Sequence, residues 1–154
     1  MANCYKAGAF KQYFDENMTA LGLPVPSTLF DNFNAAIANA GLILETLGSL
    51  GKGATMAEVI KATTGLEKLK VAASLGAAFY VGAAIGSIAV ASGRSLGCGS
   101  RMADMFVLMQ QNKQLEFDGW HAFYAMNPEI LNKSSRVRRL YFSKALSASK
   151  KTYA

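Results

Sequence analysis

An uncharged stretch of 23 residues, from position 71 to position 93, constrains this chain more than any other feature. Its sequence is VAASLGAAFYVGAAIGSIAVASG, with Lys68 and Lys70 before it and Arg94 after it. A helix of this length covers roughly 30 Å, about the thickness of the hydrocarbon layer of a bilayer. The stretch therefore predicts an apolar helix that either crosses a membrane or lies at the centre of a bundle, surrounded by other helices.

Small residues recur along one side of this predicted helix. With about 100° of rotation per residue, five of them fall within a sector about 40° wide: Ala78, Gly82, Gly86, Ala89 and Gly93. Glycine inside a helix in water costs about 1 kcal/mol relative to alanine, so aligned glycines need a reason. A face of small residues lets a second helix approach closely, and close packing is the main attraction between helices in lipid. We therefore predict that this small-residue stripe is a helix–helix contact.

The remaining sequence indicates an all-α protein. The 154 residues are enough for one domain with a core, and apolar residues make up 51% of them while charged residues make up only 17%. No run of alternating β-branched residues predicts a strand. We expect a compact helical bundle over residues 1–132, built around a hydrophobic, glycine-rich central helix at 66–97, and a basic C-terminal helix or tail at 133–154.

Local signals place some helix ends. Ser27 is a candidate N-cap for a helix that continues to about residue 47, with Glu45 on its exposed side. Thr55 and Glu58 have the spacing of a capping box. Pro128 suits the first position of a short turn after an aromatic-rich helix that begins near residue 119.

Two other segments have amphipathic patterns. Aromatic residues at helical spacing between positions 5 and 14 predict an N-terminal helix that ends near Gly22. After residues 97–99, a helix is expected with one apolar face, which is either core or a partner surface: Met102, Met105, Phe106 and Met109.

The formal charge of +6 belongs to the C-terminal segment. Residues 133–154 hold seven basic and no acidic side chains, whereas residues 1–132 sum to −1. Interleaved apolar residues favour anionic lipid or a protein groove over nucleic acid, and a solvated terminal helix is the alternative. The basic residues predicted to contact a membrane or partner are Lys133, Arg136, Arg138, Arg139 and Lys144.

Catalytic chemistry has little support in the sequence. His121 is the single histidine, so a site with several histidines is excluded. Cys98 could pair with His121, but Cys98 lies in a Gly-Cys-Gly turn and no second feature supports the pair. Cys4 and Cys98 lack metal-binding spacing, and free thiols are the expected state, with a disulfide left open. We predict no catalytic residue, metal or cofactor.

The glycine-striped segment, residues 76–97, together with the size of the chain, resembles the small glycine-zipper pore-forming effectors of the bacterial type VI secretion system. This resemblance implies an antibacterial toxin that inserts into the inner membrane of a target cell. There it would self-associate into an ion-conducting pore and dissipate ion gradients. The implied partners are the lipid bilayer, other copies of the chain, the secretion-tube protein and a cognate immunity protein.

The first residues, MANCYKAGAFKQYF, lack the apolar run of a secretory signal. We therefore expect synthesis in the cytoplasm and secretion without a signal peptide. Two alternatives remain open at this point. The chain could be a soluble helical adaptor or immunity-type protein whose methionine face and basic tail bind a partner, or a small integral membrane protein.

Overall fold

The computed structural model describes residues 10–23, 29–51, 53–63, 66, 76–92, 102–117 and 119–131. These residues confirm the all-α prediction, because they form helices and no strand. The helices, in chain order, are α1 (Phe10–Ala20), α2 (Phe33–Leu50), α3 (Met56–Ala62), α4 (Ala77–Ser92), α5 (Met102–Gln111), the 3₁₀ helix η1 (Lys113–Leu115), α6 (Trp120–Met126) and the 3₁₀ helix η2 (Pro128–Ile130).

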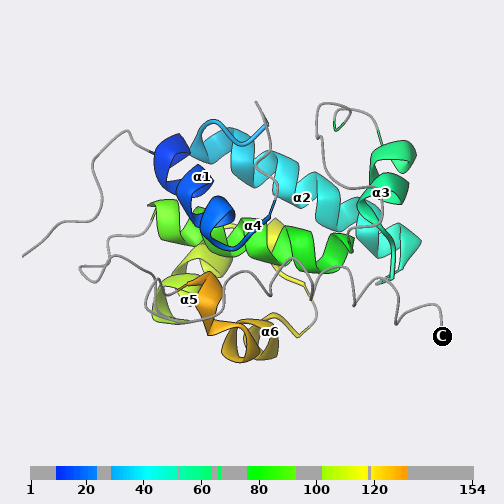
Figure 1. The fold of residues 1–154 in the computed structure, drawn as a ribbon. Helices are drawn as coiled ribbons and strands as arrows, with labels where there is room; N and C mark the ends of the chain where they lie inside the picture. Colours follow the sequence, from blue (N-terminus) through cyan, green and yellow to red (C-terminus); the bar gives the residue numbers. More distant parts are fainter. Residues whose placement is uncertain are drawn as a thin grey trace, which may run out of the picture.

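Helix α4 lies at the centre of the fold (Figure 1). It packs against α1, α2, α3, α5, α6 and η2. Every residue from Tyr80 to Ala91 is buried, so this helix has no solvent-facing side over that length. A helix that is apolar all round needs such a surrounding layer in water. In Figure 1, α1 and α2 lie on one side of α4, and α5 and α6 lie on the other.

The predicted start of the central helix is wrong. We expected helix from residue 66, with its uncharged part beginning at residue 71, but Leu66 is outside any helix and α4 begins at Ala77. Gly76 forms an isolated antiparallel bridge with Thr55, and the Ala77 amide donates to the Ala54 carbonyl at 3.0 Å. This pairing holds Gly76 in an extended conformation, and glycine has a weak preference for helix that does not oppose it.

Helix α2 also begins later than expected. Its N-cap is Asn32, whose side-chain oxygen accepts from the Ala35 amide at 2.9 Å. Ser27 lies outside the described residues, but residues 29–32 form a turn and not a helix. Phe30 belongs to this turn and is buried in the core, which explains why it continued the apolar pattern of α2 in the sequence. Glu45 is exposed, as predicted.

The other local signals are confirmed. Thr55 and Glu58 form a reciprocal capping box at the start of α3. Pro128 is the first residue of η2, directly after α6. Helix α1 ends before Gly22, which has a φ of 78° that favours glycine.

An aromatic cluster joins α1 to the start of α2. Phe14 stacks on Phe30 with ring centroids 5.1 Å apart, and Phe10 packs edge-on against Phe33 at 6.1 Å. At the surface beside this cluster, Lys11 contacts Asp15 at 2.8 Å and Asp31 at 3.5 Å. The hydrogen bond to Asp15 is the main reason why the pKa of Lys11 is raised. These exposed ion pairs contribute little to stability, so the rings are the main link.

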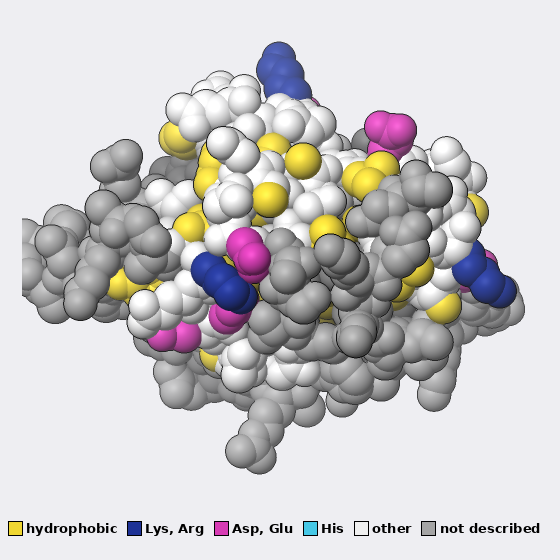
Figure 2. Space-filling view, turned by 90° about the horizontal axis from the view of Figure 1, so that it is seen from above, with side chains coloured by type: hydrophobic (Ala, Val, Ile, Leu, Met, Phe, Trp, Pro, Cys, Tyr) yellow, Lys and Arg dark blue, Asp and Glu magenta, His cyan; other side chains and the backbone are white. Residues whose placement is uncertain are grey.

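No helix within the described residues has both the length and the apolar character needed to cross a bilayer. On the face shown in Figure 2, the described charged side chains are few, and some Lys or Arg side chains lie directly beside Asp or Glu side chains. The described part of this face therefore carries no large patch of a single charge.

Candidate helix-packing site

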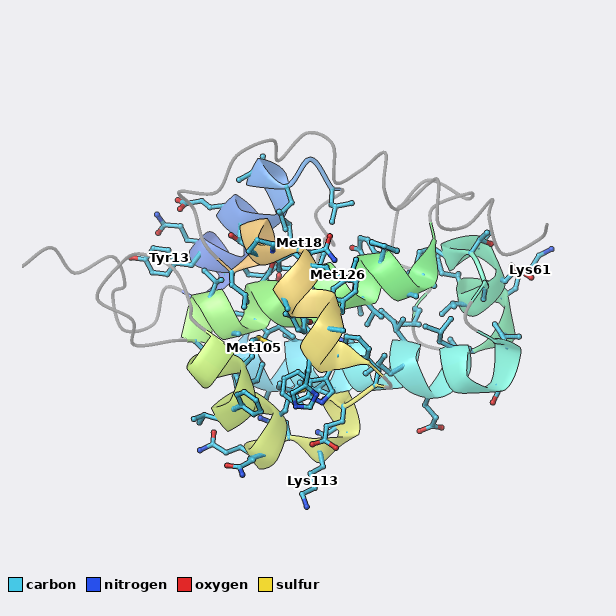
Figure 3. The ribbon with its side chains drawn as sticks, turned by 90° about the horizontal axis from the view of Figure 1, so that it is seen from below. Tyr13, Met18, Lys61, Met105, Lys113 and Met126 are labelled. Atoms are coloured by element: carbon cyan, nitrogen blue, oxygen red, sulfur yellow. The ribbon has the colours of Figure 1, made fainter. Side chains whose placement is uncertain are left out.

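The small-residue stripe is described at four of its five predicted positions. Gly82, Gly86 and Ala89 are buried and Ala78 is half-buried, whereas Gly93 lies outside the described residues. At Gly82 and Gly86 the stripe faces a neighbouring part of the same chain, namely α6 and η2. Figure 3 shows α6 crossing α4 on this side of the molecule.

The absence of a side chain at Gly82 permits this contact with α6. A Cβ atom at position 82 would lie 2.6 Å from Cζ and 2.7 Å from Cε2 of Phe123. Real Cβ atoms do not approach other heavy atoms this closely, so any side chain at position 82 would displace the phenyl ring. Gly82 therefore gives Phe123 access to the main chain of α4.

Gly86, one turn further along α4, leaves room for η2 in the same way. A Cβ atom at position 86 would overlap Cγ2 of Ile130 and lie 3.1 Å from Cε1 of Tyr124. Ile130 is fully buried and Tyr124 is almost fully buried, so neither can turn into solvent to make room. The two glycines together form the surface on which the segment from α6 to η2 is seated.

A hydrogen bond also joins α6 to α4 at this contact. The hydroxyl group of Tyr124 donates to the Gly82 carbonyl oxygen at 2.6 Å. Burial raises the pKa of Tyr124 well above its ordinary value of 10.0, because the charged phenolate would lack the hydration that stabilises it in water. Burial raises the pKa of Tyr80 on α4 as well. Both phenols therefore stay neutral and can donate hydrogen bonds at physiological pH.

A second polar contact connects α1, α4 and η2. The side-chain amide of Asn17 donates to the Ser87 hydroxyl at 2.9 Å and to the Ile130 carbonyl oxygen at 3.0 Å. Asn17 is 1% exposed and Ser87 is fully buried. The Oδ1 atom of Asn17 has no hydrogen-bond partner, which leaves a desolvated acceptor in the core. One side chain thus holds three elements together, at the cost of an incomplete polar network.

The predicted methionine face of α5 is correct only in part. Met105 and Met109 are buried against the core, but Phe106 is 44% exposed and Val107 is 52% exposed. Phe106 lies over Trp120 and His121 of α6, with centroid distances of 5.3 and 5.1 Å. The helix turns Phe106 away from the core because it stands only one residue from Met105. The side chain of Met102 is outside the described part.

Other predicted features fall outside the described residues. They include the basic positions from Lys133 to Lys144, both cysteines, and therefore the contact between Cys98 and His121. His121 itself is exposed and stacks on Trp120, with centroids 3.7 Å apart. Within the described ranges, no group of three or more His, Cys, Asp or Glu side chains is placed to hold a metal ion.

The sequence predicts the small-residue stripe but does not predict which residues contact it. The sequence predicts a short helix that includes Trp120 and Tyr124, but it does not indicate which element this helix contacts. It also does not single out Asn17. A signal existed, because two glycines one turn apart on an apolar helix leave room for a close neighbour, and this aromatic segment could supply it. Comparison of the chain with family models, with curated proteins and with solved structures gives no match.

Proposed function

We propose that this protein is a membrane-active, pore-forming toxin that holds its central helix in a closed bundle until it meets a bilayer. On the membrane, α6 and η2 separate from α4. The exposed small-residue stripe then packs against the same stripe of other copies. The resulting helix-lined pore conducts ions and collapses the gradients of the target cell.

The observation that supports this proposal most directly is the contact of Gly82 and Gly86 with Phe123 and Ile130. The two glycines of the stripe at positions 82 and 86 are already covered within one chain. Their cover is short, since α6 has 7 residues and η2 has 3. A surface that accepts a close neighbour in the closed bundle can accept a second α4 in lipid, where close packing drives association.

The burial of α4 gives a physical reason why the bundle would open at a membrane and not in water. The side chains of α4 carry no charge. In water, separating α4 from its neighbours would expose apolar surface at about 25 cal/mol per Å². In a bilayer this penalty disappears, so the membrane supplies the difference in free energy between the closed and open forms.

The biological setting follows from the resemblance to type VI effectors. The proposed route is delivery by the secretion tube to the inner membrane of a competing cell. A cognate immunity protein is then the partner expected in the producing cell.

A disulfide that fixes η2 to α4 tests the opening step. A Cβ atom at position 86 would lie 3.5 Å from Cβ of Ile130, within the range that a disulfide spans. We suggest Gly86→Cys with Ile130→Cys, in a chain whose Cys4 and Cys98 are replaced by Ser. The oxidised protein is added to dye-loaded anionic vesicles before and after reduction, and we expect leakage only after reduction. Because Gly86 belongs to the stripe, the reduced variant is compared with the cysteine-free chain, and the small Cys side chain should allow partial to full leakage.

A matched disulfide provides the control. A Cβ atom at position 41 would lie 3.9 Å from Cβ of Gln114, so Gly41→Cys with Gln114→Cys links α2 to η1 and leaves α6 and η2 free. This oxidised control should leak dye like the cysteine-free chain. Equal leakage from both oxidised proteins would exclude separation of η2 from α4. Absence of leakage in every state, with the protein remaining in the supernatant, would exclude the membrane function.

That last result would favour a helical adaptor or immunity-type protein. A specific observation supports this second candidate, because apolar side chains of α5 and α6 are exposed. Phe106 and Val107 are about half exposed, and Met126 is 76% exposed. Exposed aromatic and methionine side chains are enriched in protein–protein contacts.

A further inference from the structure

An apolar pocket of about 240 Å³ lies beside the helix-packing site. It is a half-open pocket between α2, the first turns of α4, and the segment from Phe117 to Phe123. Within the part of the chain that the structure describes, the lining residues have no polar or charged side chain: Leu44, Leu47, Ala78, Phe79, Val81, Phe117, Gly119 and Phe123.

Three phenylalanines give the pocket an aromatic character. The ring of Phe123 lies edge-on to Phe79, with centroids 5.4 Å apart, and edge-on to Phe117 at 5.7 Å. Edge-to-face contacts of this kind are the arrangement that aromatic groups prefer with one another. A further aromatic ring in the pocket would find ring faces and edges to pack against.

We propose that this pocket binds an uncharged aromatic molecule of about two fused rings. A dry apolar cavity of about 150 Å³ holds benzene, so about 240 Å³ suits the next larger ring system. The described lining residues favour an uncharged ligand, because none of their side chains could replace the hydrogen bonds that a charged group makes with water. Hydroxylated analogues of the same size should bind more weakly for the same reason.

The position of the pocket predicts that ligand binding stabilises the closed bundle. Phe123 lines the pocket and also covers Gly82, while Leu44 and Phe79 belong to α2 and α4. A bound ring therefore contacts α2, α4 and α6 at once and stabilises the closed bundle by mass action. This regulatory part rests on the proposed function, since it predicts that the ligand suppresses vesicle leakage. The binding itself does not depend on it.

The test uses 1-fluoronaphthalene with the full-length protein. Binding is measured by broadening or displacement of the ¹⁹F resonance, and by the thermal unfolding midpoint. At ten times the dissociation constant, the midpoint should rise by about 4 °C. An unshifted resonance together with an unchanged midpoint would overturn the proposal.

Substitutions locate the binding site. Ala78→Phe places a ring in the pocket and should weaken binding at least tenfold. Ala38→Phe makes the same change at an exposed position of α2 and should leave binding unchanged. If Ala78→Phe lowers stability too far, Leu44→Ala provides a second measurement, because it enlarges the pocket and should admit 9-fluorophenanthrene. Unchanged binding by Ala78→Phe, or failure of Leu44→Ala to admit the larger ligand, would place the site elsewhere.

Two results separate this inference from the proposed function. Binding without leakage in any condition would retain the pocket and reject the pore. Leakage without binding would retain the pore and reject the pocket. Binding that becomes detectable only after residues 132–154 are deleted would assign the pocket to the chain's own C-terminal segment and overturn the proposal of a small ligand.

Discussion

The hydroxyl group of Tyr124 donates a hydrogen bond of 2.6 Å to the main-chain carbonyl oxygen of Gly82. This bond joins α6 to the middle of α4, where Gly82 has no side chain to keep the two segments apart. The same glycine seats the ring of Phe123. A feature that is typical of helix pairs in membranes is thus used to close a bundle within one chain.

The fit between Gly86 and Ile130 predicts a size-dependent coupling. Gly86→Ala introduces a Cβ atom that overlaps Cγ2 of Ile130, so we expect the free energy of unfolding to fall by about 1–3 kcal/mol. Ile130→Ala alone should cost about 2–5 kcal/mol through the cavity it leaves. The double variant should cost less than the sum, by about 1 kcal/mol or more, in urea denaturation.

Gly48→Ala is the control for this cycle. Gly48 lies in α2, and a Cβ atom there meets nothing within 4 Å. Its replacement should therefore stabilise the protein by up to about 1 kcal/mol through helix propensity. Strict additivity of the two substitutions at positions 86 and 130 would mean that the two side chains do not compete for the same space.

The buried contact of Asn17 predicts an unequal effect of two similar substitutions. Asn17→Ala removes the hydrogen bonds to Ser87 and to the Ile130 carbonyl, and we expect a loss of about 1–3 kcal/mol in the free energy of unfolding. Asn34→Ala, at an exposed position of α2, should change it by less than about 0.5 kcal/mol. Chemical denaturation of both variants provides the comparison. Equal effects would show that Asn17 does not hold α1, α4 and η2 together.

Alkaline pH should destabilise the fold through Tyr80 and Tyr124. Burial raises the pKa of both phenols above the ordinary value of 10.0. Above about pH 10 the unfolded chain releases these protons while the folded chain retains them, so stability is fully present below pH 10 and is lost as the pH rises. The loss is up to about 1.4 kcal/mol per pH unit for each tyrosine.

Tyr124→Phe isolates one of these groups. Its free energy of unfolding should decline less steeply with pH between about 10 and 11.5 than that of the natural chain, although the lost hydrogen bond lowers its stability by about 1 kcal/mol at neutral pH. Parallel curves for the two proteins would argue against ionisation of Tyr124 as a source of the decline.

The basic C-terminal segment predicts a charge-selective interaction with membranes. Deleting residues 133–154 removes seven basic side chains and changes the formal charge from +6 to −1. Binding to anionic vesicles in a co-sedimentation assay should fall strongly, and binding to neutral vesicles should change little. High salt should reproduce the deletion, because screening shortens electrostatic interactions to about 8 Å or less. Equal binding of the intact protein to both kinds of vesicle would contradict this role.

Local interactions explain which parts of the fold could be predicted. The capping box of Thr55 and Glu58 and the helical turn at Pro128 depend on residues within a few positions of each other, so the sequence contains all their partners. The uncharged stretch at residues 71–93 predicted an apolar helix that either crosses a membrane or lies at the centre of a bundle, and the structure places residues 77–92 in a buried central helix. The exposed position of Glu45 follows from the apolar period of its own helix.

Tertiary contacts decided the rest. The start of α4 at Ala77 depends on the pairing of Gly76 with Thr55, which are far apart in sequence. Local pattern also placed Phe30 within a helix, whereas packing against Phe14 places it in the turn before one.

For the small-residue stripe, the sequence determines one part of the contact and the tertiary structure determines the other. By itself the sequence determined that Gly82 and Gly86 form a face that another segment can approach closely, because the lack of a side chain is a local property. It did not determine which segment would do so. That choice depends on how Phe123, Tyr124 and Ile130 are brought across α4 by the packing of the whole chain.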